Sequence, residues 1–563
     1  MSSTIFEPHP PTSPSHTDTE VGRLPRIKIR WDVLMLAAII VVVIGAALRW
    51  IGLSWGLPLQ LNSDEWVIVH GAIDMAKRNS FEPPYFFRPD HLEIQLSYLA
   101  YEAYAHIFHG VSPEVLYATQ PSPFFHISRA ITALFGIGMI VVAYLIGSRF
   151  ARPIGLLSAT AVAFFPIFIG NSHYATPDIP LTFTCMLVIL GCVRYLQSPS
   201  WPNLLLACLG VSLGFTVKYP AALGTLMIAI VIVISAVRRR TWGRIFTHGV
   251  VAICAVFGFI FALSPVLVTN IHEVMTQLTG QNTGGHLGAS GLNWPQSMAF
   301  YAANFASNAG LLLVLLSLLA VVYCIRFRRV EMIPLGLGLI YWVGLSKLSL
   351  HWDRWGLPMY LTPLLLAPIG LYYLSAHVRQ VATGRRWWRA GLSVGAALVL
   401  VNLVIGSIAS IATFKGTDSR AYAQGYFRDH DITAENTVFE GYTPLNPGMA
   451  KVFFSSFEVV DGKLTVKQNP ANPTGLRYVA VSSVMYGRYL AAPESEYPSE
   501  RQVYELLDQQ FPLIRTWESV QPVNNSILEV VNIPRNIGYI NALARGGLAG
   551  PIIKLYAVPP AHA

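Results

Sequence analysis

The sequence predicts an α-helical protein that crosses a membrane many times and carries a mixed α/β region at its C-terminus. Of its 563 residues, 53% are hydrophobic and 12% are charged, whereas soluble chains carry about 25% charged residues. The mean hydropathy is +0.47. Many apolar runs have the length that a helix needs to cross the hydrocarbon core. Too few charged side chains remain to cover a water-facing surface, so lipid is expected to contact much of this chain.

Eleven membrane spans are expected, with about eleven transmembrane helices in residues 31–413. A first tail, residues 1–30, is rich in Pro, Ser and Thr and is expected to be disordered and cytoplasmic. The expected spans are 33–51, 129–148, 154–171, 178–196, 203–217, 221–237, 246–268, 308–325, 331–346, 356–376 and 391–413.

The basic residues between these runs predict the orientation of the chain. They collect in every second loop between the expected spans. The short loops on the other side hold only Lys218, Lys347 and Arg354. Because Lys and Arg favour the cytoplasmic side, the N-terminus is expected there and the loop 52–128 and the tail 414–563 outside. The positive net charge of +9 therefore reflects topology, and no nucleic-acid partner is expected.

The first outer loop contains two expected helices, Trp66–Arg78 and Asp90–His109, with apolar faces suited to the membrane interface. Asn62 and Glu65 have the spacing of a capping box. In the tail, the runs 437–439, 452–454, 478–484 and 552–558 resemble strands, and 500–511 resembles a helix. All five cysteines lie in apolar runs, so neither a disulfide framework nor a metal-type spacing is expected.

Ionisable residues gather at the expected outer ends of the spans. Each has an ordinary structural alternative, such as helix capping, snorkelling of a lysine or a local ion pair, but acids at the ends of spans are often functional. The candidates are Asp64, Glu65, Arg88, Asp90, His91, Tyr174, Asp178, Lys218, His351, Asp353 and Arg354. Together they would suit a lipid phosphate and a polar acceptor that meet at the level of the lipid headgroups.

Over residues 33–376 the chain resembles the GT-C superfamily of glycosyltransferases that use polyprenyl-phosphate sugars. It is most similar to bacterial family 39, the relatives of protein O-mannosyltransferases and aminoarabinose transferases. The segments that carry the resemblance are Asp64-Glu65, Arg88–Leu92, Tyr174-x-x-x-Asp178-x-Pro180-Leu181, Thr216–Tyr219 and Asp353-Arg354-Trp355 with Pro358 and Pro363. Pro89-Asp90-His91 departs from the proline pair of the relatives by adding charge.

The resemblance implies transfer of a sugar from a polyprenyl-phosphate donor to an extracytoplasmic acceptor (protein, glycolipid or wall glycan), with inversion and an oxocarbenium-like transition state. Asp64 would be the general base, and Glu65 and Asp178 would position the acceptor or orient that base. Lys218 and Arg354 would hold the donor phosphate, with Arg88 as a weaker candidate.

No cofactor is certain, although His91 and His351 leave a divalent metal open. A transporter or flippase is the alternative, but its ionisable residues would lie near the midplane of the membrane.

Overall fold

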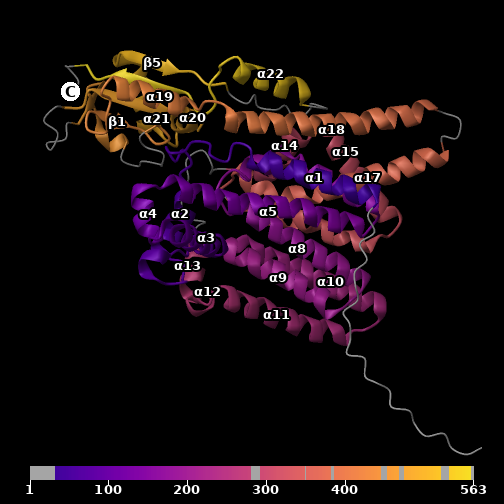
Figure 1. The fold of residues 1–563 in the computed structure, drawn as a ribbon. Helices are drawn as coiled ribbons and strands as arrows, with labels where there is room; N and C mark the ends of the chain where they lie inside the picture. Colours follow the sequence, from indigo (N-terminus) through magenta and orange to yellow (C-terminus); the bar gives the residue numbers. More distant parts are fainter. Residues whose placement is uncertain are drawn as a thin grey trace, which may run out of the picture.

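The computed structural model describes residues 32–280, 292–348, 350–381, 386–444, 453–467, 475–492, 494–520 and 532–559. The expected disordered tail, residues 1–30, lies outside these ranges. A bundle of long helices occupies the middle of the molecule, and the strands of the C-terminal region lie together above one end of it (Figure 1). The predicted fold class, a polytopic helical membrane protein with a C-terminal region that contains strands, is confirmed.

Seven helices of the described ranges are long and apolar enough to cross a membrane. They are α1 (Val33–Trp50), α5 (Ser122–Ser148), α8 (Asp178–Gln197), α10 (Gly224–Arg239) with the preceding turn η1 (Tyr219–Leu223), α11 (Gly243–Leu263), α17 (Leu357–Val381) with η3 (Asp353–Gly356), and α18 (Arg386–Lys415). An eighth candidate is the pair α14 (Trp294–Ala309) and α15 (Leu311–Arg326), which bends by 113° between the two helices.

The other expected spans coincide with shorter or broken helices. Instead of one helix over 154–171, the chain forms α6 (Arg152–Ala163) and α7 (Pro166–Asn171). The break follows from Pro166, which begins α7 and forces Phe165 into an extended conformation. The remaining short helices are α9 (Trp201–Val217), α12 (Val266–Thr269), η2 (Val330–Gly336) and α16 (Leu337–Leu345). The number of crossings and their direction stay predictions.

Helix α8 forms the centre of the bundle and packs against α9, α5, α10 and α17. Its contact with α9 depends on glycines, because a Cβ atom on Gly191 would lie 2.5 Å from the backbone nitrogen of Ala207. A Cβ atom on Gly210 would lie 2.8 Å from the backbone nitrogen of Val188. Small residues let two membrane helices approach closely in this way. The packing fixes the end of α8 that carries Asp178.

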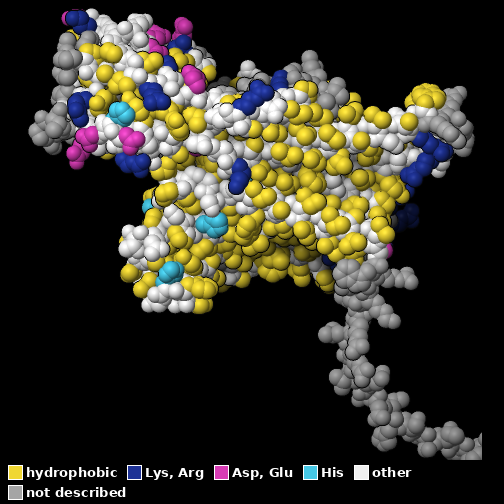
Figure 2. Space-filling model, turned by 45° about the horizontal axis from the view of Figure 1, so that its top comes forward, with side chains coloured by type: hydrophobic (Ala, Val, Ile, Leu, Met, Phe, Trp, Pro, Cys, Tyr) yellow, Lys and Arg dark blue, Asp and Glu magenta, His cyan; other side chains and the backbone are white. Residues whose placement is uncertain are grey.

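The kinds of side chain on the surface differ between the helical bundle and the C-terminal region. Hydrophobic side chains cover the helical bundle, whereas most of the charged ones in view gather over the C-terminal strands and at the opposite end of the helices (Figure 2). Exposed apolar residues are numerous on α1, α11 and α15. Such a continuous apolar band is what lipid contact requires.

The first loop contains the expected helices α2 (Glu65–Arg78) and α3 (His91–His109), followed by α4 (Pro113–Thr119). The expected capping box is wrong. Asn62 Oδ1 accepts from the backbone of Asp64 at 3.0 Å, and Asp64 itself is the residue before α2, without a capping bond from its side chain. Glu65 instead points into the protein, where it meets a buried arginine.

The C-terminal region holds a four-stranded sheet in the order β1-β4-β6-β5 and a hairpin of β2 and β3. The strands are β1 (Thr437–Phe439), β2 (Phe457–Val460), β3 (Lys463–Val466), β4 (Tyr478–Ser482), β5 (Leu513–Trp517) and β6 (Ile553–Ala557). The helices are α19 (Ser419–Asp429), α20 (Ser483–Ala491), α21 (Pro498–Gln510) and α22 (Ile533–Ala544). The expected strand at 452–454 is wrong: Phe454–Ser456 form a 3₁₀ turn, and residue 452 lies outside the described ranges.

One arginine attaches this region to the first loop. Arg420 is buried and donates to both carboxylate oxygens of Asp418 at 2.9 Å. Its Nη1 donates to the backbone oxygen of Leu61 at 2.8 Å. The C-terminal region is therefore bonded to the segment that leads into Asp64.

A buried carboxyl group in the C-terminal region predicts a dependence of stability on pH. Burial raises the pKa of Glu440 to about 8, although the hydrogen bonds from Tyr504 and from the backbone of Ser482 favour its charged form. Since its pKa is higher in the folded chain than in the unfolded one, the stabilisation is complete below the unfolded pKa of 4.5 and is lost as the pH rises towards 8. The loss is at most about 1.4 kcal/mol per pH unit.

We expect Glu440→Gln to reduce this decline, because glutamine does not ionise, and its oxygen can accept from the backbone of Ser482 while its amide donates to the hydroxyl oxygen of Tyr504. The measurement is the Tm of the purified full-length protein at pH 5, 6, 7 and 8, with the exposed Glu458→Gln as the matched control. A decline with pH that is as steep in Glu440→Gln as in the unchanged protein would contradict the assignment.

Candidate active site

Four charged side chains from distant segments meet at one end of the bundle. Asp178 Oδ1 lies 2.8 Å from Lys218 Nζ, and Asp178 Oδ2 lies 3.6 Å from Arg354 Nε. Arg354 Nη1 donates in turn to Asp64 Oδ2. The chain of ion pairs therefore runs from Lys218 through Asp178 and Arg354 to Asp64. All four residues were expected at the site from the sequence, and the structure brings them together.

Each of these side chains is placed by the end of a helix. Asp178 is the first residue of α8, where the helix dipole favours a negative charge. Lys218 follows the last residue of α9, and its Nζ lies 5.0 Å from the centre of the Trp355 ring. Arg354 belongs to η3, which leads directly into α17. The bundle therefore fixes three members of the cluster, and the first loop supplies Asp64.

A second ion pair adjoins this cluster. Arg88 Nε lies 2.5 Å from Asp90 Oδ2, and Arg88 Nη2 donates to the backbone oxygen of Asp64 at 3.3 Å. The backbone of Asp90 donates to the oxygen of Val217 at 3.1 Å. Arg88 and Asp90 thus join the loop segment of Asp64 to the turn of Lys218.

The side chains of the cluster differ in how much of their surface is exposed. The side chains of Asp64 and Arg354 are 33% and 28% exposed. Those of Asp178 and Lys218 are 3% and 13% exposed. Asp64 and Arg354 are therefore the more accessible members of the cluster, and Asp178 is buried next to Arg354.

Charge also determines the ionisation of Asp64. Burial raises the pKa of Asp64, but the positive charges of Arg354 and Arg88 outweigh that effect and hold the pKa below its ordinary value. Asp64 is therefore ionised at neutral pH, and its proton affinity is low while Arg354 remains its partner.

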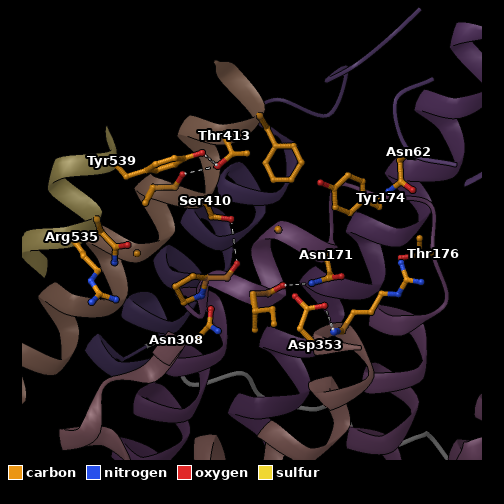
Figure 3. Close-up of a pocket in the computed structure, with 18 residues that line it drawn as sticks. Asn62, Asn171, Tyr174, Thr176, Asn308, Asp353, Ser410, Thr413, Arg535 and Tyr539 are labelled. Carbon is orange, nitrogen blue, oxygen red and sulfur yellow. Dashed lines mark hydrogen bonds between the residues drawn. The ribbon is translucent and has the colours of Figure 1, made fainter. Parts of the chain in front are cut away.

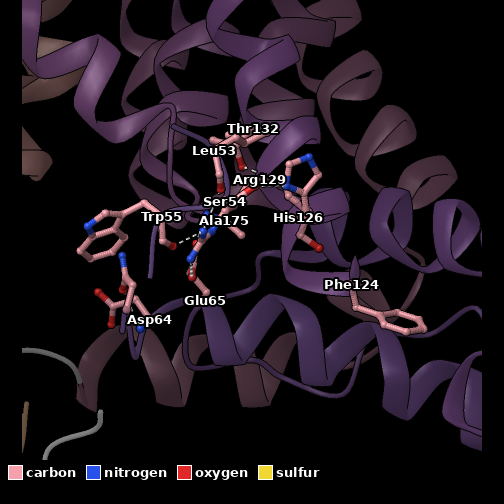
Figure 4. Close-up of polar contacts among 12 residues, drawn as sticks. Leu53, Ser54, Trp55, Asp64, Glu65, Phe124, His126, Arg129, Thr132 and Ala175 are labelled. Carbon is pink, nitrogen blue, oxygen red and sulfur yellow. Dashed lines mark hydrogen bonds and ion pairs between the residues drawn. The ribbon is translucent and has the colours of Figure 1, made fainter. Parts of the chain in front are cut away.

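Glu65 lies in a different environment from Asp64, although the two are adjacent (Figure 4). Glu65 and Arg129 are completely buried and form a two-point ion pair, with both distances at 2.7 Å. Arg129 also donates to the backbone oxygens of Leu53 and Trp55, and Glu65 accepts from the backbone of Ala175 at 2.9 Å. The structure thus places Glu65 where it holds the first loop, α5 and the segment before α8 together.

His91 and its neighbour Glu93 are also buried. His91 Nδ1 lies 2.7 Å from Ser264 Oγ, and its Nε2 lies 2.8 Å from the backbone oxygen of Tyr85. Burial lowers the pKa of His91 to about 4 and raises that of Asp90 to about 6. Both ring nitrogens of His91 are engaged within the protein. Among the described residues, no group of three or more His, Cys, Asp or Glu side chains could hold a metal ion.

A cavity of about 530 Å³ adjoins Arg354 (Figure 3). The expected site residues Tyr174, Asp353 and Arg354 line it, and His351 lies outside it with its ring 4.9 Å from that of Phe300. The other lining residues come from the first loop, α7, the segment between α7 and α8, α14, α18 and α22: Asn62, Pro166, Ile167, Gly170, Asn171, Thr176, Asn308, Gly406, Ala409, Ser410, Thr413, Phe414, Arg535, Asn536 and Tyr539. Arg354 is the member of the charged cluster that borders this space, which is large enough for a small ligand.

Sequence reasoning missed three contributors to this region. Arg129 stands at the start of an expected span, where a charged residue is itself a signal. Trp355 was part of a resemblance motif, but its contact with Lys218 was not expected. Helix α22 was not expected at all, because the sequence around it lacks a distinctive motif.

Part of the sequence matches a known protein family. Residues 126–268 match the family of dolichyl-phosphate-mannose-protein mannosyltransferases. The matched segment includes Arg129, Asp178 and Lys218, and it excludes Asp64 and Arg354. None of the curated proteins matches the chain.

Several solved structures are similar at low identity. ArnT from Cupriavidus metallidurans, bound to undecaprenyl phosphate, is 14% identical over 70% of this chain and 76% of its own, with a TM-score of 0.42. The protein O-mannosyltransferase Pmt1-Pmt2 complex of S. cerevisiae, bound to the sugar donor, is 15% identical. The match covers 44% of this chain and 35% of the yeast chain, with a TM-score of 0.34. The Archaeoglobus fulgidus oligosaccharyltransferase, in complex with zinc and sulfate, is 12% identical. The match covers 85% of this chain and 72% of the oligosaccharyltransferase, with a TM-score of 0.45.

All of these TM-scores lie below 0.5, so the match in sequence carries the comparison. That match confirms the resemblance to GT-C glycosyltransferases, and of the expected site it includes Tyr174, Asp178 and Lys218: over residues 126–268, this membrane protein is similar to the dolichyl-phosphate-mannose-protein mannosyltransferases.

Proposed function

We propose that the protein is a membrane glycosyltransferase that moves a sugar from a polyprenyl-phosphate donor to an extracytoplasmic acceptor. The observation that carries this proposal is the chain of ion pairs from Lys218 to Asp64, which borders the cavity at Arg354. A partly exposed carboxylate next to a partly exposed guanidinium supplies the two charges that the reaction needs. The family match at residues 126–268 supports a lipid-phosphate donor.

Arg354 and Lys218 bind the donor phosphate. A guanidinium group offers several donors in a plane that matches phosphate oxygens, and an ammonium group adds a point charge. When the bond between the sugar and the phosphate breaks, negative charge grows on the phosphate, and these cations stabilise it. A protonated leaving group is not required, because a lipid phosphate already leaves readily.

Asp64 removes the proton from the acceptor. Its partner Arg354 lowers its proton affinity, which works against a base. A donor phosphate that binds Arg354 takes over part of that positive charge. The pKa of Asp64 then rises towards the range of a useful base. Binding of the donor therefore activates the base that acts on the acceptor.

Asp178 positions the cations, because it is buried and contacts both Lys218 and Arg354. Glu65 acts through the position of its neighbour Asp64 rather than by contact with a substrate. Attack from the side opposite the phosphate gives inversion at the anomeric carbon. The N-terminus is cytoplasmic in this proposal, and the end of the bundle that carries Asp64 is extracytoplasmic.

A transfer assay with purified protein tests the function. Radiolabelled polyprenyl-phosphate mannose, galactose, arabinofuranose and aminoarabinose are each supplied with an extract of membrane and wall acceptors, and a nucleotide sugar serves as the comparison. We expect transfer from one lipid-linked donor and none from the nucleotide sugar. Absence of transfer from all four lipid-linked donors would contradict the proposal.

The same assay tests the role of Lys218. We expect Lys218→Met to raise the KM for the lipid-linked donor by about 10- to 100-fold, the value of a hydrogen bond between charged groups. The matched control is Lys347→Met, since Lys347 is exposed and lies 5.6 Å from the ring of Trp294, outside the cluster. Equal KM values for the two variants would exclude Lys218 from phosphate binding.

A further inference from the structure

We infer that the cavity beside Arg354 is a carbohydrate subsite and that helix α22 of the C-terminal region forms its specificity-determining wall. The inference rests on the proposed function and names a part of the site that the charged cluster does not include. The ligand is a sugar ring, which arrives either on the lipid donor or as part of a glycan acceptor.

The chemistry of the lining fits a sugar. Asparagine amides, which donate and accept at once, come from the first loop, α7, α14 and α22: Asn62, Asn171, Asn308 and Asn536. Hydroxyl groups come from Thr176, Ser410, Thr413 and Tyr539, and aromatic rings come from Tyr174 and Phe414. Neutral hydroxyl groups of a sugar pair with amides and hydroxyls, and its apolar face packs on aromatic rings. A lipid tail or an apolar peptide would leave most of these polar groups without partners.

Two buried polar atoms of the lining lack hydrogen-bond partners among the described residues. They are the hydroxyl of Thr176 and Nε of Arg354. Thr176 is 2% exposed, and Arg354 Nε lies 3.6 Å from Asp178, which is too long for a hydrogen bond. Buried polar groups are almost always paired in native proteins. Residues of the cavity wall therefore keep hydrogen-bonding capacity that the described residues do not use.

Helix α22 is held in place against the cavity by specific bonds. The backbone of Asn532 donates to Asn402 Oδ1 at 2.6 Å, and the Asn532 amide donates to the backbone oxygen of Ser307. Further along α22, where it contacts α18, the hydroxyl groups of Tyr539 and Thr413 lie 3.0 Å apart. These bonds join α22 to α18 and α14, so the wall is fixed rather than loosely apposed.

The contact also depends on the absence of a side chain on α18. A Cβ atom on Gly406 would lie 2.6 Å from Pro166 Cγ and 3.5 Å from Asn536 Nδ2. Gly406 therefore allows α7, α18 and α22 to converge at the cavity. Arg535, Asn536 and Tyr539 all line this space from α22, and Figure 3 labels Arg535 and Tyr539 among the lining residues.

The test uses full-length protein with Asn536→Cys, purified in detergent, and follows modification of the new thiol by a charged methanethiosulfonate reagent. Mass spectrometry of the peptide separates this thiol from the native cysteines. Asn541→Cys is the matched control, because Asn541 lies on the same helix, is exposed and does not line the cavity. Equal Tm values for both variants and the unchanged protein show that the fold is kept.

Three sets of ligands are compared: polyprenyl phosphate alone, the four polyprenyl-phosphate sugars named above, and soluble mannan and arabinan oligosaccharides. We expect a saturating sugar-bearing ligand to slow the modification of Asn536→Cys about tenfold, with no effect on Asn541→Cys. Protection by a lipid-linked sugar assigns the subsite to the donor, and protection by an oligosaccharide assigns it to the acceptor.

Two results would overturn the inference: equal protection by polyprenyl phosphate without a sugar, or no protection by any sugar-bearing ligand. These results are distinct from failure of the proposed function. If the transfer assay succeeds and Asn536→Cys is never protected, the function stands and the subsite is wrong. If transfer fails with every donor while a sugar protects, the chain binds carbohydrate without transferring it.

Discussion

Replacing Asp64 by asparagine should lower the rate of sugar transfer by about 10²- to 10⁴-fold, the usual contribution of a general base. Asparagine has nearly the same shape as aspartate but cannot accept the proton of the acceptor. Arg354 keeps Asp178 as a partner at 3.6 Å, so the cluster is expected to remain assembled. The measurement is kcat for transfer from the lipid-linked donor, with KM for the donor determined in parallel.

Two further variants make the result specific. Asp74→Asn is the matched control, because Asp74 lies on the same helix as the Asp64 segment and forms an exposed pair with Arg78, which contributes little. Asp178→Asn separates the two acids of the cluster. If Asp64→Asn turns over at the rate of the unchanged protein and Asp178→Asn does not, the base is Asp178 and the assignment of Asp64 is wrong.

Replacing Arg129 by leucine should destabilise the protein by about 3–5 kcal/mol, the cost of leaving one partner of a buried ion pair without the other. Glu65 would remain buried with a single backbone donor from Ala175. The backbone oxygens of Leu53 and Trp55 would also lose their donor. The measurement is thermal unfolding of purified protein in detergent, and the expected result is a clear fall in Tm.

The control for Arg129→Leu is Arg78→Leu, which removes an exposed pair with side chains about 40% exposed and should change the free energy of unfolding by less than about 1 kcal/mol. The double variant Arg129→Leu with Glu65→Leu should recover part of the loss, because no buried charge is left alone. A Tm of Arg129→Leu equal to that of Arg78→Leu would show that Glu65 is not held by this pair.

Much of the candidate site was predictable because its residues stand at the ends of helices. Charged side chains inside an apolar run are costly, so those at span ends mark one level of the membrane. Asp178, Lys218 and Arg354 were predicted to lie at one level on that ground, and the family resemblance predicted that they form one site. The loop that carries Asp64 follows the first span, which brings it to the same level.

The remaining features depend on contacts between distant segments. Asn62 and Glu65 have the spacing of a capping box, but a buried arginine 64 positions further along the chain offers Glu65 a stronger partner. A local pattern cannot compete with that contact. The wall formed by α22 was likewise missed, because it depends on which helix packs against which, whereas the break at Phe165 follows from the local signal of Pro166.

The bond between Arg420 and Leu61 has a consequence for the synthesis of the protein. The cavity is lined by residues from Asn62 to Tyr539, so its last wall is synthesised long after its first. Asp64 and Arg354 enter the membrane region much earlier. A nascent chain therefore holds the charged cluster before α22 is available to form its side of the cavity.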